Sequence, residues 1–216
     1  MTNSNLKAKS FDDALRAAER HLSRRDPIVR QIIKRYGPCT IRPHTRYFDT
    51  LVGSIISQQL STKAAETIRA RFISLYAPAR FPKAAQILAT ADEALRGVGL
   101  SGQKASYIKD LAAKTEDGTL KLSRLARMSD EEIIEMLVQI KGIGVWTVQM
   151  FLIFSLGRLN VLPVGDLGVR RAIERSYGLK QLPNAAEIEK IAEQQGWSPY
   201  CSVVSWFFWR SLENKD

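Results

Sequence analysis

Four residues in the second half of the chain combine a glycine turn with charged side chains before and after it. Gly142 and Gly144 separate two helical patterns, Lys141 precedes them, and Asp166 follows an apolar helix and a Leu-Pro-Val-Gly loop. Glycine permits a tight turn and close approach of the backbone to another molecule. The N–H groups at the start of the next helix lack intrahelical partners and suit a phosphate. A carboxylate beyond such a turn indicates chemistry beside a nucleic-acid backbone.

Each of these features also has an ordinary structural interpretation. A two-glycine turn between helices is common in proteins, and Asp166 stands where the N-cap of a helix over Leu167–Tyr177 is expected. The two roles of Asp166 are compatible, because a capping carboxylate can still activate water or stabilise a developing cation. The pattern alone leaves both interpretations open.

The elements that must position these residues are predicted to be helices. Apolar residues recur at intervals of three and four, strand signals are scarce, and the fold class is therefore all-α with roughly ten short helices. The glycine turn joins a helix over 130–139 to one that begins at Val145, which is a helix-hairpin-helix motif. Capping-box spacing predicts helix starts at Ser10, Thr90, Ser129 and Asn184.

We expect one domain over residues 1–216, built from two helical lobes flanking a cleft. The first lobe covers about 48–141 and ends at the hairpin, and the second combines about 1–47 with 165–216. The apolar helix of residues 145–156 would cross between the lobes. Clefts between lobes are common ligand sites.

The charge balance favours a polyanionic partner. The chain has 32 Lys and Arg against 22 Asp and Glu, a net charge of +10, and the positive residues are spread along its length. Such a pattern predicts a basic face on a folded body, which suits nucleic acid through phosphate contacts and counterion release. A basic surface that serves only solubility is the alternative.

The cysteine and histidine content limits the metal chemistry. Cys39 and Cys201 are too few for a four-cysteine iron–sulfur cluster or zinc site, and His21 and His44 do not favour a zinc-activated water. The polar N-terminus resembles no signal peptide, and the most apolar stretch, residues 143–156, is too short to span a bilayer. We expect an intracellular protein with no membrane partner.

Aromatic and amide side chains could recognise a base outside the duplex. Trp146 begins the second hairpin helix, and further aromatic residues crowd the C-terminal segment. Most such rings form core, yet a stacking face contributes about 1–3 kcal/mol per base, and a cationic base gains a cation–π contact. Gln59, at the end of an apolar helix, and Leu100, in a glycine-bearing loop, are candidate wedges for the gap left by an extruded nucleotide. A polar helix end and a routine connection are the plainer interpretations.

Five segments in order along most of the chain resemble the helix-hairpin-helix superfamily of DNA glycosylases. Within it, the chain is similar to 3-methyladenine DNA glycosylase II, the alkylbase DNA glycosylase. Each segment is weakly specific alone, whereas the ordered set is strongly specific. The segments are residues 55–65 (IISQQLSTKAA), 99–105 (GLSGQKA), 140–147 (IKGIGVWT), 162–171 (LPVGDLGVRR) and 197–209 (WSPYCSVVSWFFW).

The resemblance implies a role for each candidate residue. Asp166 matches the catalytic aspartate. Trp146 occupies the position of the lysine nucleophile in members with lyase activity, so a monofunctional hydrolase without AP-lyase activity is implied. The remaining roles are a base pocket of Trp146, Trp209 and Met150, wedge or minor-groove contacts from Gln59, Leu100 and Ser61, a phosphate-binding hairpin of Lys141, Gly142 and Gly144, and a monovalent cation, Na⁺ or K⁺, on the carbonyls of Val138, Ile140 and Ile143.

The resemblance also implies the substrate and the setting. The expected partner is duplex DNA carrying alkylated purines such as 3-methyladenine and 7-methylguanine, bound by a monomer in the nucleoid or nucleus. We expect that no cofactor is required, that no iron–sulfur cluster is present, and that the chain lacks the β-rich N-terminal domain of longer relatives. Three positions depart from the family pattern: Cys201 replaces an Arg of many relatives, Ser61 a His of some, and Met150 an aromatic residue.

Two other functions stay open on the sequence. The same scaffold could bind damaged or abasic DNA without catalysis, which predicts binding without base release. A helical protein–protein module with a purely structural hairpin would show no salt-dependent DNA affinity, whereas a DNA-binding protein loses affinity steeply as salt rises.

Overall fold

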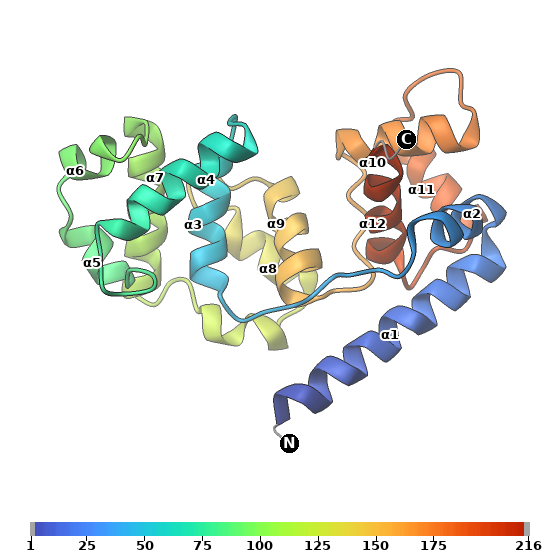
Figure 1. Cartoon of the computed structure of the whole chain (residues 1–216), viewed down its shortest axis with the longest axis horizontal. Helices are drawn as coiled ribbons and strands as arrows, with labels where there is room; N and C mark the ends of the chain where they lie inside the picture. The colour runs from blue at the N-terminus through green and yellow to red at the C-terminus, as the bar shows by residue number, and fades with distance from the viewer. Residues whose placement is uncertain (1–2, 214–216) are drawn as a thin grey trace. The chain divides into compact units, whose positions relative to one another are not determined.

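The computed structural model describes residues 3–213, and their side chains from residue 10 onward. The described residues form twelve α-helices, one 3₁₀ segment and one π-helical segment, with no strand, which confirms the all-α prediction (Figure 1). None of the described helices is both long and apolar enough to cross a membrane.

The chain divides into two compact units, each described here by itself. The terminal unit comprises Met1–Arg42 and Gly157–Asp216, and the central unit comprises Pro43–Leu156. The terminal unit contains α1 (Asn3–Arg25), α2 (Pro27–Tyr36), α10 (Leu167–Tyr177), α11 (Ala185–Gln194) and α12 (Cys201–Leu212). The central unit contains α3 (Tyr47–Ser57), α4 (Thr62–Ser74), α5 (Ala84–Ala89), α6 (Asp92–Gly97), α7 (Gly102–Glu116), η1 (Leu122–Arg127), α8 (Asp130–Leu137), α9 (Val145–Phe151) and η2 (Leu152–Leu156).

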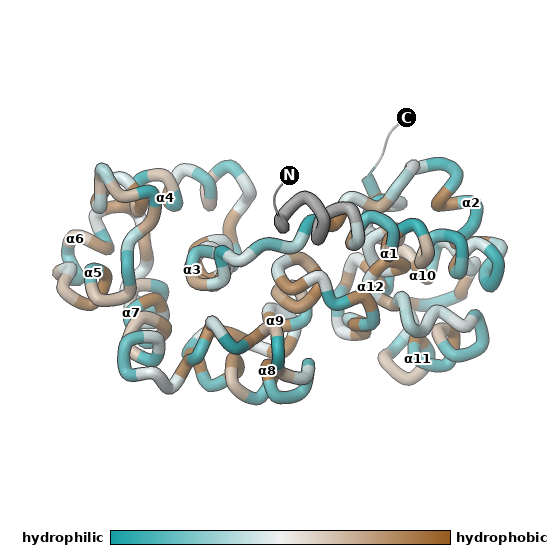
Figure 2. The backbone as a smooth tube through the Cα atoms, turned by 90° about the horizontal axis from the view of Figure 1, so that it is seen from below, coloured by the Kyte–Doolittle hydropathy of each residue, from teal (hydrophilic) through white to brown (hydrophobic). Residues whose placement is uncertain are grey.

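The central unit extends further along the chain than the first lobe expected from the sequence. We expected that lobe to end at the hairpin and the following helix to cross between lobes. Instead α9 lies within the central unit, because it packs against α8 and α3. Brown, hydrophobic stretches of the backbone tube lie beside the α9 label in Figure 2. The predicted continuous helix over 145–156 is α-helical to Phe151 and π-helical from Leu152 to Leu156.

Helix α3 forms the core of the central unit. Leu51, Val52, Ile55 and Ile56 are fully buried, with at most 1% of their surface exposed, and they recur at helical spacing. The α3 helix packs against α4, α7 and α9. A core of this kind holds the end of α3 and the hairpin as rigid supports for functional side chains.

A buried carboxylate organises the terminal unit. Asp26 is fully buried and caps α2, accepting hydrogen bonds from the backbone N–H groups of Ile28 and Val29. Its other oxygen accepts from the Tyr177 hydroxyl and from Trp197 Nε1. These four donors satisfy a group that would otherwise be costly to bury. Asp26 thus ties the start of α2 to the end of α10.

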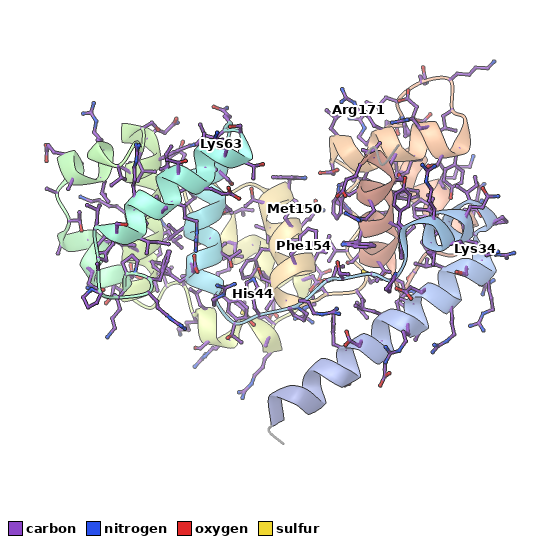
Figure 3. The ribbon with its side chains drawn as sticks, in the orientation of Figure 1. Lys34, His44, Lys63, Met150, Phe154 and Arg171 are labelled. Carbon is purple, nitrogen blue, oxygen red and sulfur yellow. The ribbon has the colours of Figure 1, made fainter. Side chains whose placement is uncertain are left out.

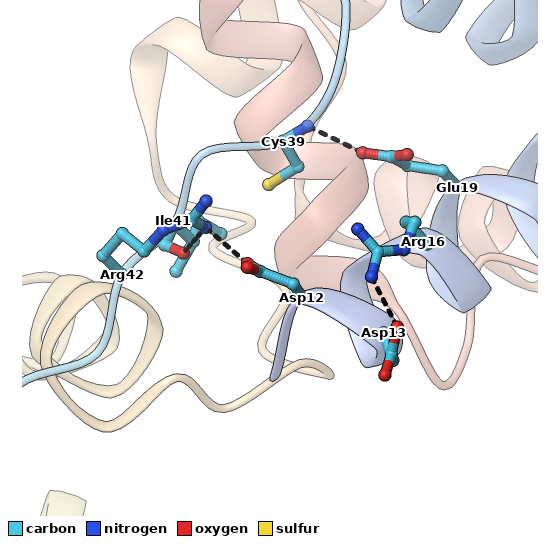
Figure 4. Close-up of polar contacts among 7 residues, drawn as sticks. All are labelled: Asp12, Asp13, Arg16, Glu19, Cys39, Ile41 and Arg42. Atoms are coloured by element: carbon cyan, nitrogen blue, oxygen red, sulfur yellow. Dashed lines mark hydrogen bonds and ion pairs between the residues drawn. The ribbon is translucent and has the colours of Figure 1, made fainter. Parts of the chain in front are cut away.

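The segment after α2 is tied to α1 by polar contacts (Figure 4). The Cys39 backbone N–H donates to Glu19 Oε1 at 2.7 Å, and the Arg42 guanidinium lies 3.1 Å from Asp12 Oδ1. Burial raises the pKa of the Cys39 thiol to about 12. Cys39 is therefore a protonated core residue at neutral pH, as expected for a reduced structural cysteine.

Two of the four predicted capping boxes are confirmed. Ser129 caps α8 with Glu132 as its reciprocal partner, and Asn184 caps α11 in the same way. The predictions at Ser10 and Thr90 are wrong. Ser10 lies inside α1, which already begins at Asn3 among good helix formers. Thr90 ends α5, since its hydroxyl donates back to the Gln86 carbonyl.

Candidate active site and nucleic-acid interface

The hairpin turn between α8 and α9 is fixed by contacts from outside the motif. Gly142 has a φ of +80°, and a Cβ built there would lie 2.1 Å from Tyr107 Cδ2, so only glycine fits. Gln58 Nε2 donates to the Gly142 carbonyl at 2.6 Å. The Lys141 backbone N–H donates to Asp110 Oδ2 at 3.0 Å. The turn is thus a rigid, positioned loop.

The outer surface of the hairpin is open. A Cβ built on Gly144 would meet nothing within 4 Å, and Gly144 caps α9 without a side-chain hydrogen bond. Lys141 is exposed, and Val145 and Trp146 each expose 51% of their surface. This combination of small residues, a cation and exposed backbone can accept a phosphate at close range.

The carbonyls expected to hold a cation belong to the same turn. Val138 is the C-cap of α8, and the Ile140 carbonyl accepts a hydrogen bond from the Ile143 N–H at 3.0 Å. A carbonyl oxygen has two lone pairs, so this bond leaves one for a ligand. Three carbonyls within six residues fit the oxygen donor set that hard cations require. In the part of the chain that the structure describes, no cluster of three His, Cys, Asp or Glu residues could hold a metal.

The turn after α3 holds a strained residue at the surface. Gln59 is exposed and has a φ of +56°, a left-handed conformation that costs roughly 1–2 kcal/mol for a residue with a Cβ. Strained residues persist only where the surroundings hold them, and they cluster at functional sites. The predicted wedge residue Gln59 is therefore displayed in a costly, fixed conformation.

Lys104 stabilises this turn through hydrogen bonds from its side chain. Its Nζ donates to the carbonyls of Ile56 at 2.8 Å and Gln58 at 2.6 Å. The carbonyl groups at the C-terminal end of α3 thus receive hydrogen bonds from a cationic donor. Burial lowers the pKa of Lys104. Sequence reasoning missed Lys104 and Gln58 as supports, because both partners lie far from them along the chain.

The other two candidates for DNA contact have different environments. Ser61 is exposed and caps α4, accepting from the Ala64 N–H at 3.3 Å. Leu100 exposes only 4% of its surface in this structure, so a wedge at this position requires the side chain to leave the core, and its wedge role stays a prediction. Leu100 directly follows Gly99, whose φ of +104° lies in the left-handed region. Leu60, 39% exposed and adjacent to Gln59, is an apolar residue that the sequence reasoning missed.

A cavity of about 760 Å³ lies in the central unit, which is the usual size of a small-molecule site. The predicted pocket residues Trp146 and Met150 line it, and so does Gln59. His44, Met150 and Phe154, labelled in Figure 3, reach it from the segment before α3, from α9 and from η2. Further lining comes from Tyr107, Lys104, Thr147 and Ser155. The wall therefore combines aromatic surface with a few polar groups.

Asp166 caps α10, as the sequence predicted. It is 7% exposed, and its Oδ1 accepts from the Val169 N–H at 2.8 Å. The same oxygen accepts from Trp209 Nε1 at 2.8 Å, a contact that spacing could not reveal. A Cβ on Gly168 would lie 3.0 Å from both Asp166 Oδ1 and Trp209 Cδ1. Glycine at 168 thus permits the tight approach of the indole to the carboxylate.

Known DNA-repair proteins are similar to this chain over most of its length. Residues 52–197 match the model of the HhH-GPD superfamily base excision DNA repair proteins. The Schizosaccharomyces pombe protein named DNA-3-methyladenine glycosylase 1 is 34% identical over 94% of this chain and 90% of its own length. The alkylbase DNA glycosidase-like protein mag2 of the same yeast is 32% identical over 93% of this chain and 95% of its own.

A solved structure has the same fold. The 3-methyladenine DNA glycosylase Mag1 of Schizosaccharomyces pombe, in complex with abasic DNA, superposes with a TM-score of 0.81. The match has 33% sequence identity and covers 92% of this chain and 98% of that one. With a family model that matches more than half of its residues, this chain belongs to the HhH-GPD superfamily of base excision DNA repair proteins.

Proposed function

We propose that this chain is a monofunctional DNA glycosylase that hydrolyses the N-glycosidic bond of alkylated purines in duplex DNA. The products are the free base, such as 3-methyladenine or 7-methylguanine, and an abasic site. The observation that carries the proposal is the carboxylate of Asp166, held by Val169 and Trp209 at the start of α10 in a member of this repair superfamily. Relatives named 3-methyladenine DNA glycosylase support the substrate class.

The proposed reaction begins with extrusion of the damaged nucleotide. Extrusion costs a few kcal/mol, and less where the damaged base pairs weakly. Gln59 fills the gap, and the base enters the central-unit cavity against Trp146 and Met150. An N3- or N7-alkylated purine is cationic, so stacking gains a cation–π contribution. Trp209 of α12 is proposed to act through Asp166, to which its indole N–H donates.

The chemical step needs little acid catalysis, because a cationic purine is already a good leaving group. As the bond between C1′ and the base nitrogen stretches, its electron pair leaves with the base and the sugar gains oxocarbenium character. The Asp166 carboxylate stabilises that positive charge or orients the attacking water. Trp146 offers no amine for a Schiff base, so water is the acceptor and no strand cleavage follows.

The hairpin and the basic surface bind the DNA backbone in this proposal. Lys141, Gly142 and Gly144 contact a phosphate beside the lesion. A monovalent cation on the carbonyls of Val138, Ile140 and Ile143 would supply one further positive charge there. We propose that the protein acts as a monomer wherever the cell keeps its DNA, and that it requires no other cofactor.

Base release from methylated duplex DNA tests the proposal. The wild-type protein should release methylpurines, and alkali added afterwards should cleave the strand at the abasic sites. Borohydride should trap no covalent complex with the DNA, whereas trapping would contradict the monofunctional mechanism. Tight binding to methylated DNA without base release would favour the alternative, a binder of damaged or abasic DNA.

A further inference from the structure

Two residues that line the cavity of the central unit each carry a buried polar atom without a hydrogen-bond partner. These atoms are the Ser155 hydroxyl oxygen Oγ and the His44 ring nitrogen Nδ1. Both residues line the cavity, and they are neighbours, since the His44 N–H donates to the Ser155 carbonyl at 3.0 Å. Buried polar groups in native proteins nearly always have partners. Two unpaired groups at one wall of a cavity indicate that a ligand supplies the missing partners.

The local backbone supports a functional origin for this arrangement. Ser155 lies in η2, the π-helical continuation of α9, and its residue surface is only 1% exposed. Single π-helical turns inside helices occur often at functional sites. A serine in an ordinary helix can donate to a carbonyl in the preceding turn, as Ser205 does to Cys201 at 2.8 Å in α12. Ser155 makes no such bond, so its hydroxyl can rotate to a ligand.

The surrounding wall suits a flat, positively charged base. Trp146, Met150 and Phe154 supply aromatic and polarizable surface. Burial, and then repulsion by Arg46, lower the pKa of His44, although Asp49 opposes them. The imidazole is therefore neutral at pH 7 and does not repel a cation. The Lys104 ammonium is directed to the carbonyls of Ile56 and Gln58.

We propose that His44 and Ser155 form a polar edge of the base pocket and select among alkylated purines by hydrogen bonding to the ring edge. This inference rests on the proposed function and names the groups that read the substrate. A hydroxyl and a neutral imidazole can each donate or accept. Together they match a purine edge with adjacent donor and acceptor, such as the 6-amino group and N1 of adenine or O6 and N1–H of guanine.

Thermal unfolding of two serine variants tests whether the Ser155 hydroxyl is held for a ligand. Ser155→Ala removes an unpaired buried hydroxyl, so its Tm should equal or exceed that of the wild type. Ser205→Ala is the matched control, because it removes a paired buried hydroxyl and should lower the Tm. A Tm of Ser155→Ala that falls as far as that of the control would overturn the inference.

Base selectivity provides the functional readout. Methylated DNA offers 3-methyladenine and 7-methylguanine in one reaction, so the ratio of their single-turnover release rates is internally controlled. Ser155→Ala and His44→Phe should each change this ratio about five-fold or more, as expected for one lost hydrogen bond, while Ser205→Ala keeps it. An unchanged ratio in both pocket variants would overturn the inference.

A separate binding measurement distinguishes failure of the inference from failure of the proposed function. Free 3-methyladenine is titrated into each protein and the quenching of tryptophan fluorescence is followed, since Trp146 lines the cavity. If the wild type releases no base but binds free 3-methyladenine at least five-fold more tightly than Ser155→Ala does, the polar edge stands and the glycosylase proposal fails. Equal binding by the two proteins would contradict the polar edge.

Discussion

The substitution Gly142→Ala tests how the hairpin turn is built. Two costs arise at this position. An alanine at a φ of +80° is in the left-handed region, which costs about 1–2 kcal/mol. Its Cβ would also lie 2.1 Å from Tyr107 Cδ2 and 2.4 Å from Cε2, so the ring must move, at a cost of about 1–3 kcal/mol by analogy with overpacked cores.

These two terms sum to about 2–5 kcal/mol. For a protein of this length, 1 kcal/mol shifts the Tm by roughly 2–4 °C, so Gly142→Ala should lower the Tm by roughly 4–20 °C. The displaced Tyr107 ring lines the central-unit cavity, and the Gly142 carbonyl accepts from Gln58. DNA affinity and base release should therefore fall together with stability.

The matched control is Gly144→Ala, two residues away. Gly144 has a φ of −100° and open space around the position of a Cβ, so the change costs at most about 1 kcal/mol as an N-cap substitution. Its methyl group would instead stand on the surface proposed to meet a phosphate. Circular dichroism during heating and fluorescence anisotropy with a labelled duplex measure the two effects. Equal Tm values for wild type and Gly142→Ala would refute this account of the turn.

Three further substitutions test the supports of the site. Gln59→Gly should raise the unfolding free energy by up to about 1 kcal/mol, because relief of the backbone strain outweighs the extra freedom that glycine gives the unfolded chain. The same substitution should slow base release. Greater stability with an unchanged release rate would contradict the wedge role. Trp209→Phe removes the donor to Asp166 and should cost about 1–3 kcal/mol in denaturant unfolding, with slower release as well. Burial opposes ionisation of Asp110, but hydrogen bonds from Lys114 and the Lys141 N–H outweigh it and hold the Asp110 pKa below its usual range. That stabilisation is present above about pH 4 and is lost as the pH falls through the lower folded-state pKa. Asp110→Asn should therefore weaken the dependence of Tm on pH below about pH 4. A dependence as steep as that of the wild type would argue against the Asp110 contact.

Local features of the fold could be predicted from the sequence. Asp166, Ser129 and Asn184 cap helices as expected, because a cap involves residues only two or three positions apart. The same spacing wrongly predicted a helix start at Ser10, because α1 already begins at Asn3 and Ser10 lies inside it. Capping spacing therefore identifies candidates, and the neighbouring helix formers decide between them.

Contacts between distant segments could not be predicted from spacing. Lys104 holds the end of α3 from 48 residues away, and Gln58 reaches Gly142 across 84 residues. The indole N–H of Trp209 donates to Asp166, a contact that the expected role of Trp209 as a pocket aromatic did not include. Periodicity and turn chemistry describe a chain locally, whereas these pairs depend on how the helices pack. Leu100 shows the same limit, because its burial follows from the packing of the loop after Gly99.

The measurement that tests the central claim most directly is base release from methylated duplex DNA by wild type and Asp166→Asn. Asparagine keeps an oxygen that can accept from Val169 and Trp209 and is itself a good N-cap, so the fold and the Tm should be preserved. The substitution removes the negative charge that stabilises the developing oxocarbenium ion. We predict that single-turnover release falls by about 10²–10³-fold while DNA affinity is retained. Release at the wild-type rate by Asp166→Asn would contradict the account.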